Sequence, residues 1–524
     1  NGTINIASGS VLAPQGNQTI AGTGSIVFAD GSASNRLNVE AGNLVIDSGA
    51  TVRGQTGHIG QQAFAGGAAT LTNNGTINAD GGGTITVNVT SALTNNGTMR
   101  AQNGTLLIQD AVAGTGTLQV DSTGVTNLAN TPNTQGKLVM GAAGSTLNIG
   151  TQNLTINSDY TNVAAGSGNS FDRRAGVSGA GLIVAGANAA QAITGAGVSH
   201  GATANATLTI NNVRVGATTF NYQIANTGST GPALRGAIQT SVNGANLSDA
   251  RLSGVGVSAG NYNTGGPGSN TGDLGVTFTA ATAGALAALS GQVLNLRSNF
   301  ENIADQKLNI VVGSGAAAYN PAVGSASPSP LQLANQRVGG SGSAALTVSN
   351  TAAAGSFSED LIANFGNNSG AASNNGGSVA GLLAGSSNAS AMRVGVDTSS
   401  AGAKSGSVTI DYQTAGAVNG VSNGLGAASA GSQNITVSGD VYRLAQGAAT
   451  PTPVSFGNRH VGDSASQLLA VQNTAAADGF SEKLNASISS NGAQVTASGS
   501  FNLLAAQATD SSSLQVGIDT SSAG

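Results

Sequence analysis

The sequence predicts an all-β protein in which a parallel β-solenoid is followed by tandem immunoglobulin-like β-sandwiches. Three observations lead to this fold class. Short runs rich in Val, Ile, Leu and Thr alternate with Gly, Asn, Ser and Ala along the 524 residues, which is typical of many short strands and turns. In the first third of the chain a motif returns after 22 residues. In the remainder a longer motif returns after 123 residues.

Composition excludes several classes of protein. The 17 Lys and Arg residues are scattered, so no basic patch suggests nucleic acid, and no apolar run has the roughly 18–20 residues that would span a bilayer. The absence of cysteine fits a secreted bacterial surface protein without disulfides, and fits a reducing compartment equally well. The chain begins at Asn1 without a signal peptide, as expected of a processed protein or an excised fragment.

The shorter period predicts a solenoid over residues 1–165. The segment 71–77 (LTNNGTI) returns as 93–99 (LTNNGTM), and a second strand follows each copy, at 83–87 and 104–108. A period of 20–25 residues with two short strands per unit indicates stacked coils, about seven of them here.

The paired asparagines of this motif have two interpretations. Asn73-Asn74 and Asn95-Asn96 either stack as a ladder of side chains between coils or serve only as turn residues. The NNGT-type coils resemble the right-handed parallel β-helices of bacterial autotransporter passengers and filamentous-haemagglutinin-like adhesins. That resemblance covers about a third of the chain.

The longer period predicts three repeats: residues 166–325 with a linker that includes Asp172-Arg173-Arg174 as a charged cap, residues 326–448, and residues 449–524. The string 338–359 (VGGSGSAALTVSNTAAAGSFSE) returns at 461–482, and a fainter copy begins at Val215. Apolar residues alternate along the strand within each copy, which indicates one face buried in a sandwich. Anchor positions recur at the same interval, namely Ile210, Leu333 and Phe456.

Two local features of the repeats need separate interpretation. Residues 283–289 (AGALAAL) favour a helix, but alignment with the second repeat predicts a turn before a strand, and the alignment is preferred. The third repeat stops at Gly524, before the last two strands of the second repeat. We therefore expect that the natural chain continues or that a strand from another molecule completes the sandwich.

The motif order in the repeats resembles the ASH-like modules known in bacteria as choice-of-anchor D repeats. The resemblance rests on the V-G pair, the strand ending in N-T, and V-G-φ-D-T-S-S-A-G at 394–402 and 516–524. The first repeat departs from it, because Thr279 stands in place of the Asp. Such modules are generally structural, and they often lie beside β-solenoids in secreted surface proteins.

Candidate catalytic and metal-binding residues are few, and we predict no catalytic site, no cofactor site and no metal site. His58, His200 and His460 fall in different segments, and His460 is expected on a surface strand in the slot of Arg214 and Arg337. The acids of the solenoid do not recur at coil spacing as a polysaccharide-cleaving pair would require. They are Asp30, Glu40, Asp47, Asp80, Asp110, Asp121 and Asp159.

The acids of the repeats also have structural interpretations. Asp397 and Asp519 could contribute to a Ca²⁺ site, but the sequence D-T-S-S-A-G favours an Asx-turn. Glu359-Asp360 and Glu482-Lys483 are interpreted as solvated loop charges.

These features predict an extracellular structural protein of the bacterial cell surface. It would be part of an adhesin, filament or sheath that acts through repetition and self-association, and its partner would be itself or a surface glycan or protein. One alternative is an adhesin passenger whose loops bind a host protein or glycan. A third hypothesis is a polysaccharide-active β-helix enzyme.

Overall fold

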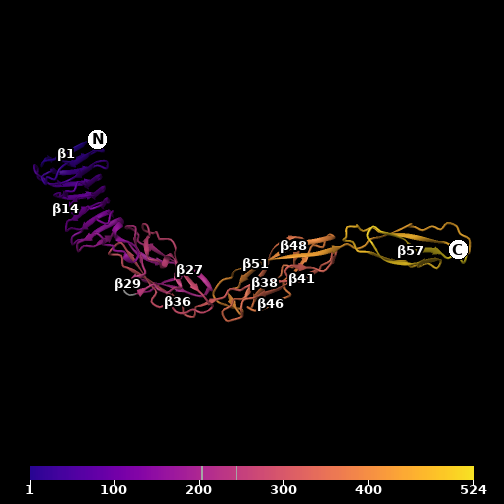
Figure 1. Ribbon diagram of the computed structural model, residues 1–524. Helices are drawn as coiled ribbons and strands as arrows, with labels where there is room; N and C mark the ends of the chain where they lie inside the picture. The colour runs from indigo at the N-terminus through magenta and orange to yellow at the C-terminus, as the bar shows by residue number, and fades with distance from the viewer. Residues whose placement is uncertain (202–203, 243–244) are drawn as a thin grey trace. The chain divides into compact units, whose positions relative to one another are not determined.

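The computed structural model describes residues 1–201, 204–242 and 245–524, and it is all-β (Figure 1). Contacts divide the chain into two compact units. The first contains residues 1–211, 216–281 and 285–316, and the second contains residues 212–215, 282–284 and 317–524. Within the described ranges, no helix has the length and hydropathy that crossing a bilayer requires.

The first unit begins with parallel strands that stack in three sheets, drawn in indigo and purple in Figure 1. The longest sheet joins nine strands in chain order, so the stacking continues past residue 165, where we expected the solenoid to end. Its strands are β1 (Thr3–Ile6), β4 (Ser25–Phe28), β7 (Thr51–Gly54), β10 (Thr76–Ala79), β13 (Thr98–Ala101), β16 (Thr117–Val120), β18 (Asn133–Met140), β20 (Leu154–Asn162) and β22 (Ile183–Ala185).

Two further parallel sheets run alongside it. One contains β2 (Val11–Leu12), β5 (Arg36–Leu37), β8 (Gly57–Ile59), β11 (Thr84–Val87), β14 (Thr105–Ile108), β17 (Val125–Leu128), β19 (Thr146–Asn148) and β21 (Val177–Ser178). The other contains β3 (Gln18–Ile20), β6 (Gly42–Ile46), β9 (Ala69–Asn73), β12 (Ala92–Asn95) and β15 (Val112–Ala113).

The prediction of two strands per coil is wrong for the central coils, because the LTNNGTI motif forms two strands and not one. The chain turns between β9 and β10 at Asn74-Gly75. A Cβ on Gly97, at the same corner of the next coil, would collide with the carbonyl oxygen of Gly75. Only glycine therefore allows two stacked corners to approach this closely.

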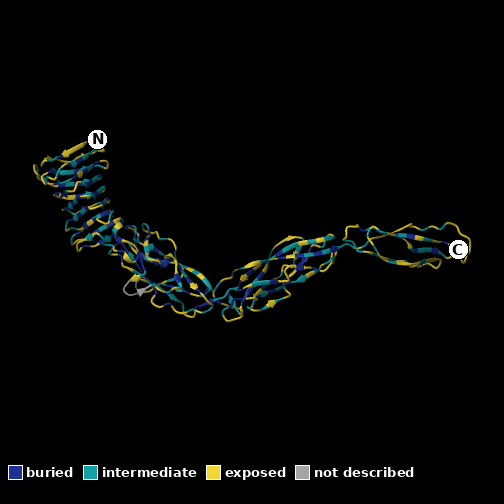
Figure 2. Ribbon diagram, in the orientation of Figure 1, coloured by how far each residue is buried: buried dark blue, intermediate teal, exposed yellow. Residues whose placement is uncertain are grey.

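Buried positions recur in coil after coil along the stack (Figure 2). Apolar side chains fill the interior, where Ile77, Met99 and Leu118 pair in register on successive coils and are at most 1% exposed. The asparagines also stack. Asn73 donates to Asn95 Oδ1 over 2.7 Å, and Asn95 donates to Gln135 Oε1 over 2.6 Å, all inside the coil. The ladder interpretation is therefore confirmed for these buried side chains. An outer pair follows it, with Asn96 donating to Asn74 over 3.2 Å.

Two sheets, antiparallel except for the parallel pair of β25 and β36, complete the first unit as a sandwich-like body. One contains β23 (Gln191–Thr194), β27 (Gly216–Asn226), β33 (Leu274–Ala280) and β31 (Leu252–Ser253). The other contains β24 (Val198–His200), β25 (Asn205–Ile210), β36 (Gln306–Val312), β35 (Val293–Ser298), β28 (Arg235–Gln239) and β32 (Gly260–Asn263). The alignment was right about AGALAAL, since Gly284–Ala285 is the short strand β34 and residues 286–290 have no regular structure.

The second repeat, in the second unit, has a large sheet with two long central strands. This sheet contains β39 (Leu331–Gln332), β51 (Ala428–Tyr442), β48 (Gly402–Thr414), β43 (Leu361–Gly370) and β45 (Ser378–Leu382), and β40 (Gln336–Arg337) also pairs with β51. Smaller sheets pack with it: β38 (Gly324–Ser327), β42 (Thr347–Asn350) and β46 (Ser387–Asn388); and β41 (Ser343–Ala345), β47 (Arg393–Val396) and β44 (Ala372–Asn374).

The third repeat has fewer strands. One sheet contains β52 (Gly447–Thr450), β53 (Ser466–Asn473), β57 (Thr509–Ile518) and β55 (Val495–Ser498), and β54 (Leu484–Ser487) pairs with β56 (Ser500–Leu504). The predicted alternation in the repeated string is confirmed, because Leu346, Val348, Leu469 and Val471 are all buried.

Candidate functional sites

The three histidines lie apart, and among the described residues no group of three or more His, Asp or Glu side chains could hold a metal ion. Burial and the nearby Arg36 lower the pKa of His58, which lies in β8. His200 Nε2 lies 2.6 Å from the carbonyl oxygen of Ile193. His460 is on the surface as expected, with 97% of its side chain exposed, but it lies outside the strands, so the strand assignment was wrong.

The acids of the solenoid each bind a partner of their own. Glu40 is 1% exposed, and its carboxylate accepts hydrogen bonds from the backbone N–H groups of residues 63–65 and from Asn38, which fastens that loop to the coil. Asp30, Asp47 and Asp110 accept backbone N–H groups, whereas three others form ion pairs: Asp80 with Arg53, Asp121 with Arg100 and Asp159 with Arg235.

The two candidate calcium ligands form the Asx-turns that the sequence favoured. Asp397 accepts the backbone N–H of Ser399 over 2.9 Å and its hydroxyl over 3.0 Å. Asp519 accepts the N–H of Ser521 over 2.9 Å. These hydrogen bonds hold the pKa of both carboxyl groups below the usual range.

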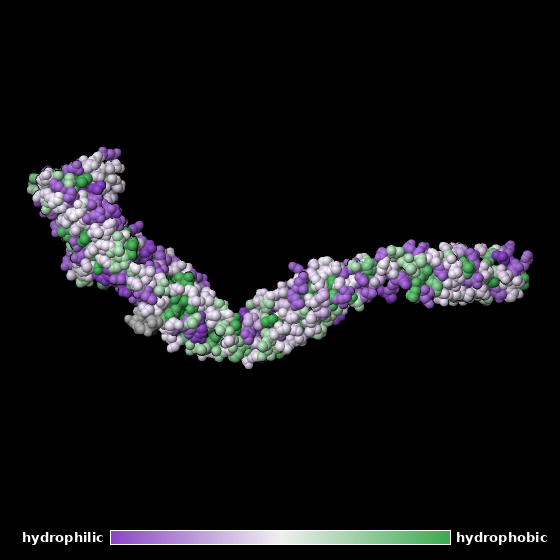
Figure 3. All heavy atoms as spheres, viewed as in Figure 1, coloured by the Kyte–Doolittle hydropathy of each residue, from purple (hydrophilic) through white to green (hydrophobic). Residues whose placement is uncertain are grey.

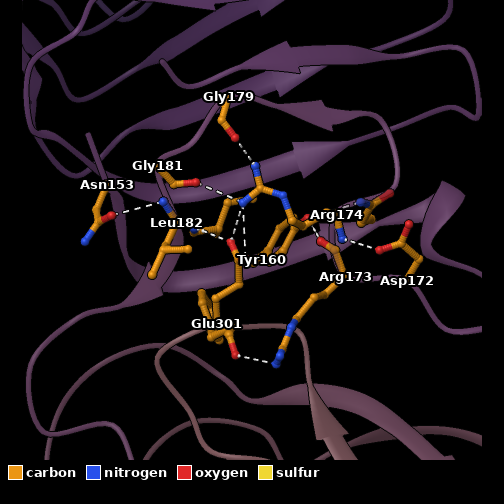
Figure 4. A network of polar contacts seen from close by, with 12 residues as sticks. Asn153, Tyr160, Asp172, Arg173, Arg174, Gly179, Gly181, Leu182 and Glu301 are labelled. Carbon is orange, nitrogen blue, oxygen red and sulfur yellow. Dashed lines mark hydrogen bonds and ion pairs between the residues drawn. The ribbon is translucent and has the colours of Figure 1, made fainter. Parts of the chain in front are cut away.

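A network of charged residues joins the end of the parallel stack to the antiparallel part of the first unit (Figure 4). Arg174 donates to the carbonyl oxygens of Gly179 and Gly181 and binds both carboxylate oxygens of Glu301. Glu301 also accepts the N–H of Ile183, in the last strand of the stack, over 2.7 Å. The expected charged cap thus lies here, and its partner comes from more than 100 residues away.

A small cavity of about 210 Å³ lies beside this network, between β20, β28 and β32. Its walls include the rings of Tyr160, Phe171 and Tyr262, but each of these residues is at most 8% exposed. The volume is below the roughly 300 Å³ of typical ligand pockets, and rings this deeply buried offer no open face to a sugar.

The most distinctive site is a buried carboxylate in the second unit. Glu359 is fully buried and binds Arg214 through two contacts, of 2.8 and 3.3 Å. Its oxygens also accept Asn423 Nδ2 over 2.6 Å and the hydroxyl of Thr414. The adjacent Asp360 is 1% exposed and accepts two backbone N–H groups of the turn at 419–420. The prediction that Glu359-Asp360 are solvated loop charges is therefore wrong.

The same arrangement returns 123 residues later. Arg337 binds Glu482 over 2.6 and 3.2 Å, with the same separation of 145 residues in sequence as Arg214 and Glu359. Here the pair is open to solvent, with exposed side-chain fractions of 67% and 31%. Glu482 thus lies in a loop and is partly exposed to solvent, as predicted, and it also forms an ion pair that was not predicted.

An aromatic pair accompanies each ion pair. The rings of Tyr319 and Phe357 are 5.8 Å apart, as are those of Tyr442 and Phe480. We call the set Arg214, Tyr319, Phe357 and Glu359 the first junction, and the set Arg337, Tyr442, Phe480 and Glu482 the second junction.

The backbone of each junction is hydrogen-bonded in the same way. Val215 N–H donates to the carbonyl oxygen of Tyr319, and Val338 N–H donates to that of Tyr442, both over 2.9 Å. The residue after each tyrosine forms a parallel β-bridge to the serine of the F-S-E sequence. These bridges join Asn320 to Ser358 and Arg443 to Ser481.

A buried asparagine fastens the glutamate from the other side. Asn350 Nδ2 donates to the carbonyl oxygens of Glu359 and Leu382, and Asn473 Nδ2 donates to those of Glu482 and Leu504. In the sequence these asparagines are the first residue of the N-T pair that ends the repeated strand. Both asparagines are at most 1% exposed, and their hydrogen bonds hold the backbone at the junction glutamate in place.

The junctions were missed at the sequence level, although a signal was present. The repeated string begins with R/H-V-G and ends with F-S-E, and both ends are as constant as the strand between them. The arginine of one string binds the glutamate that ends the next string, and a search for opposite charges at a constant separation of 145 residues would have found the pairs.

No protein-family model and no curated protein matches the sequence. Solved structures to which the chain is similar include the Dpr2 Ig1-Ig2 complex with DIP-Theta Ig1-Ig3, at 8% identity, a TM-score of 0.15, and coverage of 62% of this chain and 89% of the other. Another is CfaE, the adhesive subunit of CFA/I fimbria of enterotoxigenic Escherichia coli, at 10% identity, a TM-score of 0.12, and coverage of 56% and 98%. At these TM-scores the likeness carries no argument.

Proposed function

We propose that the chain is a structural component of the bacterial cell surface, part of an adhesin, filament or sheath, that acts through its repeat architecture and not through catalysis. Its parts would be a right-handed β-solenoid of the autotransporter type and immunoglobulin-like modules of the choice-of-anchor D type. It would work outside the cell and associate mainly with copies of itself.

The observation that carries this proposal is the recurrence of the junction. An ion pair, an aromatic pair and two backbone contacts return together at an interval of 123 residues. A ligand site needs to occur only once in a chain, whereas a set of contacts that connects successive repeats must occur wherever two repeats meet. Its recurrence therefore favours an array whose task is mechanical.

The surface supports the same proposal. Only 7% of the residues are charged, and on the face seen in Figure 3 hydrophilic and apolar residues are interspersed along the chain. Edge strands such as β45 leave backbone groups available for pairing with another copy.

The proposal is tested with the purified chain alone. Sedimentation velocity over a range of concentrations, followed by negative-stain electron microscopy, should detect assembly into fibres or sheets without added ligand. A chain that stays monomeric and binds a component of a glycan array with saturable affinity would favour the adhesin-passenger alternative. Release of sugars from a polysaccharide, abolished by changing a single solenoid acid, would favour the enzyme.

A further inference from the structure

The small sheet of β41, β47 and β44 in the second repeat, whose place β41 marks in Figure 1, has a hollow on its outer face. Val394 and Val396 of the middle strand β47 are buried in the core, so Gly395 between them faces outward. Gly395 pairs with Ser343 of β41 on one side and with Ser373 of β44 on the other. A Cβ on Gly395 would lie 3.1 Å from Ser373 Oγ. The missing side chain thus leaves a space between two serines, and both of them line a cavity of about 240 Å³ there.

The side chains around this hollow offer hydrogen-bond donors. Arg393 precedes Gly395 by two residues, so it faces the same side of the sheet, and it also lines the cavity. Arg393 Nε donates to Ser343 Oγ over 3.0 Å, and Nη2 donates to the carbonyl oxygen of Ser343 over 2.7 Å. Within the described ranges, Arg393 Nη1 and the Ser373 hydroxyl have no partner, and the proton of the Ser343 hydroxyl is not used by Arg393. No Asp or Glu lines the cavity.

The charge of Arg393 is not neutralised by the protein. Most arginines of the chain bind a carboxylate, whereas Arg393 binds none among the residues that the structure describes. A guanidinium with unused N–H groups forms its strongest hydrogen bonds with an oxyanion. The net charge of the chain is −5, so long-range attraction does not gather anions, and the short contacts in the hollow have to supply the binding.

The third repeat has the same hollow without the cation. Gly517 lies between Ser466 and Thr496 in the same register, and Gln515 takes the place of Arg393. Gln515 Nε2 donates to Ser466 Oγ over 3.0 Å, so it copies one contact of the arginine without its charge. The arginine is therefore not needed to hold this part of the sheet together.

The first repeat lacks the hollow itself. Thr277 stands at the central position of the sheet, opposite Thr219 on β27, and the two hydroxyl oxygens are 2.9 Å apart. Among the described residues, only the second repeat combines an open centre, two flanking hydroxyl groups and an arginine without an acidic partner.

We propose that this hollow binds one tetrahedral oxyanion, a sulfate or phosphate group, either as the free ion or carried on a sugar. Arg393 would bind its oxygens through Nη1 and the remaining N–H of Nη2. The hydroxyl groups of Ser343 and Ser373 would donate from the two sides of Gly395. A tetrahedral group suits these donors because they come from three strands, whereas a planar carboxylate presents both of its oxygens to one side.

This inference goes beyond the proposed structural function and does not depend on it. Self-association is measured by sedimentation, and anion binding is measured by titration of the same chain. A monomeric chain would leave the anion site standing, and a chain that assembles without binding an anion would leave the structural function standing.

The first test titrates the full chain with sodium sulfate in a calorimeter, with sodium chloride keeping the ionic strength constant. Sulfate should bind saturably, with about one ion per chain. Arg393→Gln gives the second repeat the residue of the third and should weaken binding at least about tenfold, because the charge-assisted hydrogen bonds are lost. Arg459→Gln is the matched control, since Arg459 also has no acidic partner in the described ranges and lies in the third repeat, and it should leave binding unchanged.

Two further variants separate the shape of the hollow from its charge. Ser373→Ala removes one donor without adding bulk and should weaken sulfate binding several-fold. Gly395→Ala places a Cβ in the centre and should abolish binding although Arg393 keeps its charge. Unchanged hydrogen exchange in the central strand β48 would show that each variant is folded.

Galactose 6-sulfate, galactose and sodium phosphate distinguish the sources of the anion. Tighter binding of galactose 6-sulfate than of inorganic sulfate, without binding of galactose, would assign a group carried on a sugar, whereas equal binding would assign the free ion. The proposal is overturned if sulfate, phosphate and galactose 6-sulfate all fail to bind saturably. Equal effects of Arg393→Gln and Arg459→Gln also overturn it, because the binding would then not take place in this hollow.

Discussion

The substitution Arg214→Ala tests whether the first junction holds its repeat in place. Arg214 donates from Nε and Nη2 to the two oxygens of Glu359, which has no exposed side-chain surface. Truncation would leave a charged carboxylate buried without its cation. The chain supplies a matched control, because Arg337→Ala removes the same contacts from Glu482, which is 31% exposed.

The expected magnitudes differ because the burial differs. Removing one partner of a buried ion pair costs about 3–5 kcal/mol. The lower value, about 3 kcal/mol, applies to Arg214→Ala because Glu359 keeps two other donors, Thr414 and Asn423. Solvent screens an exposed pair, which therefore contributes little, so Arg337→Ala should be much less damaging than Arg214→Ala. Added salt should weaken the exposed pair further and leave the buried pair nearly unchanged.

Native-state hydrogen exchange is the suitable measurement, because a chain of several units does not unfold in a single two-state step. The N–H of Glu359 donates to the carbonyl oxygen of Asn320 across the junction. Its protection should fall roughly 100-fold in Arg214→Ala, since about 1.4 kcal/mol corresponds to a factor of ten. The N–H of Glu482 should change less than about fivefold in Arg337→Ala. Equal losses in the two variants would refute the argument from burial.

Four further predictions concern the solenoid and the Asx-turn at Asp397. Asn95→Leu leaves buried hydrogen-bond partners on two coils unpaired and should lower the free energy of unfolding by about 3 kcal/mol. Asn96→Ala, at an exposed position, should lower it by under about 0.5 kcal/mol. Urea unfolding of the solenoid, followed by hydrogen exchange in residues 1–201, measures both, and equal effects of the two substitutions would contradict the prediction. Gly97→Ala forces apart two stacked corners whose backbones are in contact and should lower the free energy of unfolding by about 1–3 kcal/mol. A urea midpoint equal to that of the wild type would show that the coils have room for a Cβ there. Hydrogen bonds from Ser399 lower the pKa of Asp397, so its carboxylate stabilises the turn above the unfolded pKa of about 4. This stabilisation is lost as the pH falls through the folded value, so the protection factor of the Ser399 N–H, which corrects for the slower intrinsic exchange in acid, should fall. Millimolar Ca²⁺ should not change that exchange, because the hydrogen bonds from Ser399 already occupy the carboxylate, and protection by Ca²⁺ would restore the metal hypothesis.

The solenoid could be predicted from the sequence because its contacts are nearly local. Each coil packs on the next, so Thr76 pairs with Thr98 and Ile77 with Met99 at the same interval at which the motif returns. What remained undetermined was the number of strands per coil. That depends on whether Asn74-Gly75 continues a strand or turns a corner, and a dipeptide of this kind allows both.

The junctions could not be predicted in the same way, because they depend on which charges meet across 145 residues. Glu359 follows a Gly- and Ser-rich loop, and such a loop normally indicates exposure. Its burial results from the turn at 415–426, whose own position is set by the pairing of β48 with β51. Glu482 has a similar local sequence, but none of the described residues covers it in this way, so the two glutamates differ in burial for a reason that no local window contains.

The use of charge in this chain follows one physical rule. Ionisable residues are rare, and a desolvated charge is costly unless it is paired with good geometry. Such pairs contribute little net stability but penalise any other arrangement, because a shifted register would leave two charges buried and apart. Apolar packing between strands of nearly identical repeats tolerates a shift, since the neighbouring alternatives look alike. Partly or fully buried long-range ion pairs at the places where distant segments meet therefore help to specify which segments join. Examples are Arg174 with Glu301, Arg235 with Asp159 and Arg214 with Glu359.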